Sequence, residues 1–124
     1  MKPISVAAQL RTTNLERSIS FYTDVLGLDL MFEYRDFYAG LSAGGQMLHL
    51  KLVDNPDKSH AEIAEGEHFH LYFGTDDARA LAASIEAKGV ALTKPPQQTP
   101  WGTLEFALHD DEGHVLYFGE VLKP

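Results

Sequence analysis

Two stretches of the chain carry the apolar spacing that predicts an amphipathic helix. In residues 12–27 the apolar stripe consists of Leu15, Ile19, Tyr22 and Leu26. In residues 74–89 it consists of Ala78, Leu81 and Ile85. The two stretches lie half a chain apart, so the pattern predicts an internal repeat.

The residues at the ends of both stretches support this interpretation. Thr13 and Glu16 have the spacing of a capping box at the start of the first helix. Either Asp76 or Asp77 suits the cap of the second. The glycines that suit the left-handed residue after each helix are Gly27 and Gly89.

The segments around both helices alternate as strands do. In the first half the expected strands are residues 4–10, 28–34, 37–43 and 46–53. In the second half they are residues 67–74, 90–92, 101–110 and 114–121. The order βαβββ occurs twice, which predicts an α+β fold of two like modules. We expect one domain of modules 1–53 and 67–124, a flexible connector at 54–66 and a proline-rich loop at 94–100.

The alternation also predicts which side chains face the helices. The expected core positions are Leu48, Leu50, Leu52, Phe69, Leu71, Phe73, Leu104, Phe106, Leu108, Leu116 and Phe118. The opposite face then gathers His49, His68, His70, Glu105 and Tyr117. A face that mixes polar and aromatic groups is either a ligand surface or a solvated sheet face, and we favour the ligand surface.

Composition narrows the class of partner. The formal net charge is −8 and the pI is about 5.1, which argues against nucleic acid and is compatible with a cationic ligand or simply with solubility. The chain has no cysteine, which excludes disulfides, thiolate zinc sites and a cysteine nucleophile, and fits a reducing cytoplasm. No signal peptide or membrane span is predicted, so we expect a cytoplasmic protein without membrane partners.

Three stretches together resemble the vicinal oxygen chelate superfamily. They are QLRTTNLERSISFYTDVLGLDL, HFHLYFGTDDARALAASIEAKGV and DDEGHVLYFGE. This group includes glyoxalase I, extradiol dioxygenases, fosfomycin-resistance enzymes and bleomycin-binding resistance proteins. The resemblance covers nearly the whole chain and implies the double βαβββ fold, in which the two modules form a curved mixed sheet around a cleft. It also implies a homodimer, which nothing in the residues alone indicates.

The resemblance further implies four positions for the ligands of a divalent metal. In this sequence they are Ala7, His49, His70 and Tyr117. Alanine cannot bind metal, and Tyr117 stands where the enzymes usually have Glu, so only two positions hold suitable residues; His68 and Gln9 are substitutes in principle. Because a catalytic metal site normally needs at least three protein ligands, we expect no metal and no other cofactor.

A second local match favours the bleomycin-resistance-like, metal-poor members. The stretch PWGTLEFALHDDEGHVLYF is similar to theirs, and Trp101 matches a tryptophan that lines their binding groove. We therefore expect a binding protein that sequesters a flat or cationic aromatic compound, in the manner of antibiotic resistance. The expected ligand-binding residues are Phe37, Tyr38, His49, His70, Trp101, Glu105 and Tyr117.

Two enzymatic alternatives remain open at this stage. One is a metal-dependent lyase, isomerase or dioxygenase in which His49 and His70 bind the ion with substitute ligands. The other is a metal-free enzyme in which His49 or His70 acts as general base. The alternative interpretation of Trp101 is that its side chain packs in the core or against a loop.

Overall fold

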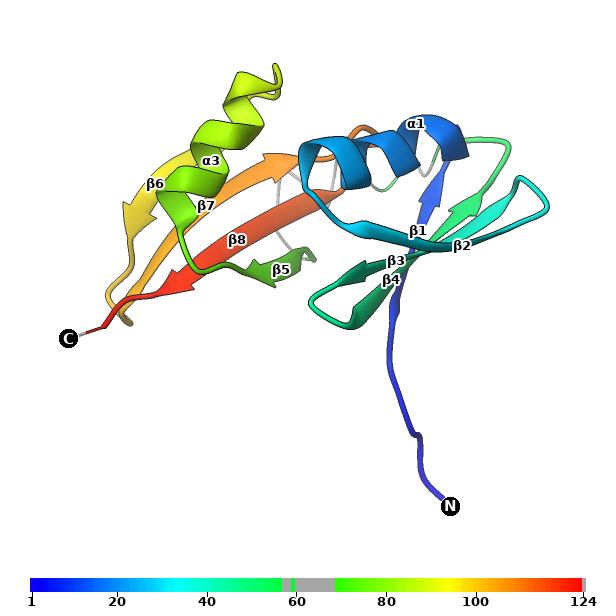
Figure 1. The fold of residues 1–124 in the computed structure, drawn as a ribbon, viewed down its shortest axis with the longest axis horizontal. Coiled ribbons are helices and arrows are strands. Elements are labelled where there is room, and N and C mark those ends of the chain that lie inside the picture. The colour runs from blue at the N-terminus through cyan, green and yellow to red at the C-terminus, as the bar shows by residue number, and fades with distance from the viewer. Residues whose placement is uncertain (57–58, 60–68, 124) are drawn as a thin grey trace. The chain divides into compact units, whose positions relative to one another are not determined.

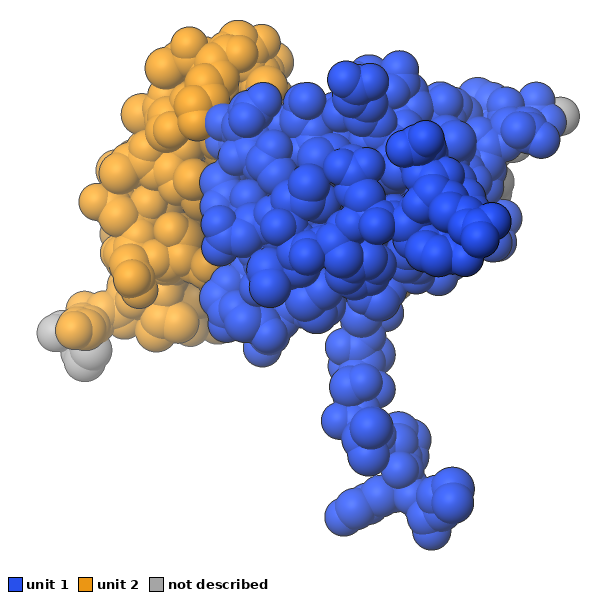
Figure 2. Space-filling view, turned by 45° about the vertical axis from the view of Figure 1, so that its right-hand side comes forward, with its two compact units in different colours: residues 1–57 blue, residues 58–124 orange. Residues whose placement is uncertain are grey.

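Each half of the chain forms a four-stranded mixed sheet with a helix on one face (Figure 1). The computed structural model describes residues 1–56, 59 and 69–123. The chain divides into unit 1, residues 1–57, and unit 2, residues 58–124 (Figure 2). The fold class of two βαβββ modules is thus confirmed. The division falls inside the expected connector, whose residues 57–58 and 60–66 lie outside the described residues, as does His68.

The two sheets have the same topology. The strands of unit 1 are β1 (Ala8–Thr12), β2 (Asp29–Tyr34), β3 (Tyr38–Ala43) and β4 (Gln46–Leu52), in the order β1-β4-β3-β2. Those of unit 2 are β5 (Leu71–Gly74), β6 (Lys94–Gln98), β7 (Thr103–His109) and β8 (Val115–Val121), in the order β5-β8-β7-β6. The first strand of each unit runs parallel to the last, and the other neighbours are antiparallel.

Both helices begin at a side chain that accepts a backbone N–H. In unit 1, α1 (Leu15–Ser20) continues into a π-helical turn, η1 (Phe21–Val25), and packs on β3 and β4. Its cap is Asn14, which accepts from the Arg17 N–H, so the predicted Thr13 cap is wrong by one residue. In unit 2, the cap of α3 (Ala78–Ala87) is Asp77, one of the two residues that the sequence allowed. The left-handed glycines are also confirmed, since φ is +80° at Gly27 and +88° at Gly89.

The core lies between each sheet and its helix, on the face that alternation predicts. Leu48 and Leu50 are buried in unit 1, and Leu104, Phe106, Leu108, Leu116 and Phe118 are buried in unit 2. Three further predicted core residues, Leu52, Leu71 and Phe73, are only half-buried. The predicted burial of Phe69 is wrong, because this side chain is 58% exposed. The reason is that β5 begins only at Leu71, so Phe69 precedes the sheet and has no strand beside it.

Two predicted strands and one predicted loop differ from the observed elements. The expected loop at 94–100 contains the edge strand β6, and the expected strand at 90–92 is absent. Pro95 and Pro96 are tolerated because the register of β6 shifts between Lys94 and Gln97, where the strand needs no N–H for the ladder. In unit 1, β1 covers residues 8–12 instead of 4–10, because pairing with β4 starts at Ala8.

None of the helices among the described residues has the length and apolar character needed to span a membrane.

Candidate functional site

In each sheet, the parallel pairing of the first strand with the last places two equivalent positions side by side. On unit 1, Gln9 of β1 lies opposite His49 of β4. On unit 2, Tyr72 of β5 lies opposite Tyr117 of β8. All four side chains belong to the face that alternation places away from the helices. The internal repeat therefore makes His49 and Tyr117 counterparts.

A hydrogen-bonded chain occupies this face of unit 1. The Gln9 Nε2 donates to the Tyr38 hydroxyl at 2.9 Å, and this hydroxyl lies 2.9 Å from the His49 Nδ1. The Phe32 ring meets the His49 ring edge-on at 5.8 Å and covers Gly40, where a Cβ would overlap it. This ring packing and the hydrogen bond hold the imidazole in one orientation.

Phe37 does not join this group. It lies in the turn between β2 and β3, is 40% exposed, and meets the Tyr34 ring edge-on at 5.6 Å. The sequence prediction grouped Phe37 with Tyr38, but Phe37 belongs to the turn before β3, and its ring packs on Tyr34 instead of on the sheet.

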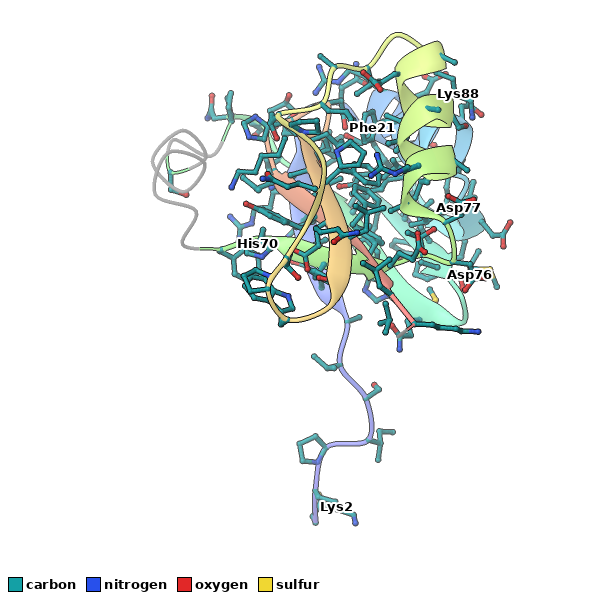
Figure 3. All side chains as sticks on the ribbon, turned by 90° about the vertical axis from the view of Figure 1, so that its left-hand side faces the viewer. Lys2, Phe21, His70, Asp76, Asp77 and Lys88 are labelled. Carbon is teal, nitrogen blue, oxygen red and sulfur yellow. The ribbon has the colours of Figure 1, made fainter. Side chains whose placement is uncertain are left out.

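Unit 2 carries a hollow of about 560 Å³ on its sheet. The side chains around it include His70, Tyr72, Lys94, Trp101, Glu105 and Tyr117. Four of these six are site residues expected from the sequence. His70 directly precedes β5, and it lies on the side of the sheet away from α3 (Figure 3).

Glu105 lines the hollow and accepts hydrogen bonds from two hydroxyl groups. Its Oε2 accepts from the Tyr72 hydroxyl at 2.7 Å and from the Thr103 hydroxyl at 2.9 Å. Burial, together with the hydrogen bond and the negative charge of Glu105, raises the pKa of the Tyr72 phenol above its ordinary value of 10.0. Tyr72 therefore stays protonated as a donor across the neutral range. Its ring lies on Gly119, where a Cβ would overlap the phenol.

Tyr117 forms an aromatic wall that two other side chains touch. The His70 ring lies 4.3 Å from the Tyr117 ring, centroid to centroid, tilted by 37°. The Lys94 Nζ donates to the Tyr117 hydroxyl at 2.7 Å and lies 5.2 Å from the ring centroid. Tyr117 thus offers a ring surface, with an ammonium at its edge.

Trp101 stands at the turn between β6 and β7 and is 71% exposed. The turn is held by the Thr99 N–H, which donates to the Thr103 carbonyl at 2.8 Å, and by the Thr99 and Thr103 hydroxyls, 2.7 Å apart. Gly102, with φ of +90°, lets the chain reverse directly after the tryptophan. The indole is therefore displayed beside the hollow on a fixed turn and is not packed in the core.

The four positions that the resemblance assigns to metal ligands do not fit a divalent ion. Ala7 and His70 stand directly before β1 and β5, and Ala7 has no donor atom. The Tyr117 oxygen accepts a hydrogen bond from the Lys94 ammonium, a positive charge that opposes a second cation there. Across residues 1–56, 59 and 69–123, no group of three His, Asp or Glu side chains is placed to hold a metal.

Comparison with known proteins identifies the family. The sequence matches the Glyoxalase/Bleomycin resistance protein/Dioxygenase superfamily over residues 4–118. The chain belongs to this superfamily. Among curated members it is similar to the lactoylglutathione lyase of Haemophilus influenzae, with 30% identity over 121 residues, 90% of this chain and 87% of that protein.

Solved structures of the superfamily share the fold. TioX from Micromonospora sp. ML1 aligns with a TM-score of 0.75 and 21% identity, over 97% of this chain and 100% of that one. TnmS3, an antibiotic binding protein from Streptomyces sp. CB03234, aligns with a TM-score of 0.72 and 20% identity, over 97% of each chain. At these identities the likeness concerns the fold alone.

Sequence reasoning missed Lys94 as a member of the site. The two prolines after it indicated a loop, which hid the fact that its strand borders the sheet beside β7. Alternation puts Tyr72 on the same face as His70, but the hydrogen bond of Tyr72 to Glu105, 33 residues away, left no local signal.

Proposed function

We propose that this superfamily member is a binding protein that sequesters a flat aromatic small molecule in the hollow of unit 2, as bleomycin-type resistance proteins do. The observation that carries the proposal is the display of Trp101, which is 71% exposed beside a hollow of about 560 Å³. A large aromatic side chain held in water on an ordered turn loses the stabilisation of burial, unless a ligand supplies the missing contact.

The chemistry of the hollow supports a ligand with both a flat ring and polar groups. Trp101 and Tyr117 offer ring surfaces for stacking, which contributes about 0.5–1.5 kcal/mol per pair beyond area burial. Glu105 and His70 offer polar contacts, and the carboxylate suits a positively charged substituent. At low ionic strength, where screening is weak, the net charge of −8 favours the approach of such a ligand over long range.

We also propose that the sheet of unit 1 contributes ligand-binding residues of its own, His49, Tyr38 and Phe37. The hydrogen-bonded chain through Gln9 supports this for His49 and Tyr38, because it presents both groups in fixed orientations. The superfamily's antibiotic-binding structures support a small molecule as the partner.

We further propose a homodimer in the cytoplasm. Light scattering should then report twice the chain's mass of 13.8 kDa, and the mass of one chain would contradict the dimer.

Fluorescence tests the proposal because Trp101 is the only tryptophan. Titration with a bleomycin-type drug and a set of flat aromatic antibiotics should quench its emission saturably for at least one compound. N-acetyl-tryptophanamide, titrated in parallel, controls for absorption and collisional quenching. Quenching that stays linear and equals that of the free amide for every compound would refute the proposal.

A second candidate is a metal-dependent lyase in which His49 and His70 bind the ion, and the similarity to lactoylglutathione lyases supports it. The donor set is unfavourable because of Ala7 and of Lys94 at Tyr117. A lactoylglutathione lyase assay with added Ni²⁺, Zn²⁺ or Mn²⁺ separates the two candidates. Metal-dependent turnover that is lost in His49→Ala and His70→Ala would favour the enzyme.

A further inference from the structure

The hollow of unit 2 holds a positive charge at the position where the superfamily resemblance implies a metal ligand. β6 begins with Lys94, which lies opposite Ala107 of β7, and Ala107 in turn lies opposite Tyr117 of β8. Lys94 and Tyr117 therefore lie on either side of Ala107 in the sheet. The Lys94 ammonium donates a hydrogen bond to the Tyr117 hydroxyl at 2.7 Å. Lys94 is exposed, so an oxygen atom of a ligand in the hollow can reach its ammonium.

The ammonium also lies beside the aromatic wall. Its nitrogen is 5.2 Å from the centroid of the Tyr117 ring, and the His70 ring contacts the same ring at 4.3 Å. A flat ligand that stacks in this hollow brings its edge to these two side chains. Lys94 and His70 both offer N–H donors, which match a carboxylate or another negatively charged oxygen.

We infer that the ligand carries an anionic oxygen, as a carboxylate or an ionised acidic hydroxyl, on its aromatic ring and that Lys94 binds this oxygen. The inference rests on the proposed function and names the chemical class of its ligand. The carboxylate of Glu105, which carries the opposite charge, accepts hydrogen bonds from donor groups of the same ligand.

The net charge of −8 does not prevent this, because salt screens it. The Debye length at physiological ionic strength is about 8 Å, so charges elsewhere on the surface act weakly on a ligand in the hollow. A direct contact between an ammonium and a carboxylate is screened far less. The local positive charge therefore decides the preference once the ligand is bound.

A matched pair of probes tests the inference: 2-naphthoate and its neutral analogue 2-naphthamide. The indole N–H resonance of Trp101 is the only one in the protein, so its shift in a ¹⁵N spectrum reports both affinities. In the wild type the carboxylate should bind about 10- to 100-fold more tightly than the amide, the range for a hydrogen bond to a charged group. Lys94→Met should abolish this preference, and Lys94→Arg should keep most of it.

Lys88→Met is the control, since it removes the same charge just after α3, outside the hollow (Figure 3). It should leave the preference unchanged. Equal binding of both probes to the wild type, or a preference that survives Lys94→Met, would overturn the inference and leave the proposed function standing. If neither probe moves the Trp101 resonance, the inference and the binding of aromatic rings in this hollow both fail.

Discussion

Gly119→Ala tests whether the tyrosine that lies over this glycine fixes the hollow. A Cβ at position 119 would overlap the Tyr72 phenol, so the ring must leave the sheet and give up its hydrogen bond to Glu105. Tyr72 is 52% exposed, so we assign about 1 kcal/mol to the lost hydrogen bond and about 1 kcal/mol to lost ring contact.

A second effect opposes this cost. Replacing a strand glycine by alanine stabilises by roughly 0.5–1 kcal/mol where the backbone accepts it. We therefore expect Gly119→Ala to destabilise the wild type by about 1 kcal/mol. In a Tyr72→Ala background the same change should stabilise by about 0.5–1 kcal/mol, because the overlapping ring is gone.

Urea unfolding of the four proteins measures this coupling of about 2 kcal/mol. Gly74→Ala in β5 is the control, since a Cβ there meets no atom within 4 Å, and it should stabilise the wild type slightly. If Gly119→Ala has the same effect with and without the Tyr72 ring, the described packing is wrong.

Three further predictions follow from the core, the pH response and the donor set. Phe106→Ala should cost about 3–5 kcal/mol of unfolding free energy, because Phe106 is 1% exposed and stacks on Phe118 at 4.8 Å; a loss below about 1 kcal/mol in urea would contradict its core position. The raised pKa of Tyr72 means that its contribution to stability is complete below pH 10.0 and is lost as the pH rises through the folded-state value. The stability difference between the wild type and Tyr72→Phe should therefore be constant up to about pH 10 and shift against the wild type above it; a flat difference to pH 12 would speak against the shift. The protein is incubated with Ni²⁺, Zn²⁺ or Mn²⁺ and then dialysed against metal-free buffer. Elemental analysis should find that less than about one equivalent of metal per chain is retained. Stoichiometric metal that disappears in both His49→Ala and His70→Ala would refute the metal-free account.

The sequence was sufficient to predict the repeat, both helices and most of the core, because these features depend on local spacing. Leu50 and Phe106 are buried, as the alternation indicates, and Asp77 caps its helix, where the pattern allowed Asp76 or Asp77. The ends of the strands could not be predicted in the same way, because a strand extends only as far as it is paired with its partner strand. Phe69 fits the alternation with Leu71, but it lies outside the sheet, because the pairing of β5 with β8 starts only at Leu71.

The site was predicted in part for the same reason. Alternation placed Glu105 and Tyr117 on one face, and both lie at the hollow of unit 2. Lys94 could not be placed, because the Pro95–Pro96 pair indicates a loop unless the partner strand is known. The two charged side chains of the hollow are hydrogen-bonded to distant residues, Lys94 to Tyr117 and Glu105 to Tyr72. These partners lie 23 and 33 positions apart, where local patterns carry no information.

Calorimetric titration of Trp101→Ala and Tyr117→Ala with the compound that quenches best tests the central claim most directly. Each variant should lose about 1–3 kcal/mol of binding free energy, as expected for an aromatic anchor. Trp101→Ala should change the unfolding free energy by less than about 0.5 kcal/mol, since the side chain is 71% exposed. Val121→Ala, which removes a side chain that is 79% exposed outside the hollow, should change neither quantity. Undiminished affinity in both aromatic variants, or unfolding of Trp101→Ala, would contradict a ligand site in this hollow.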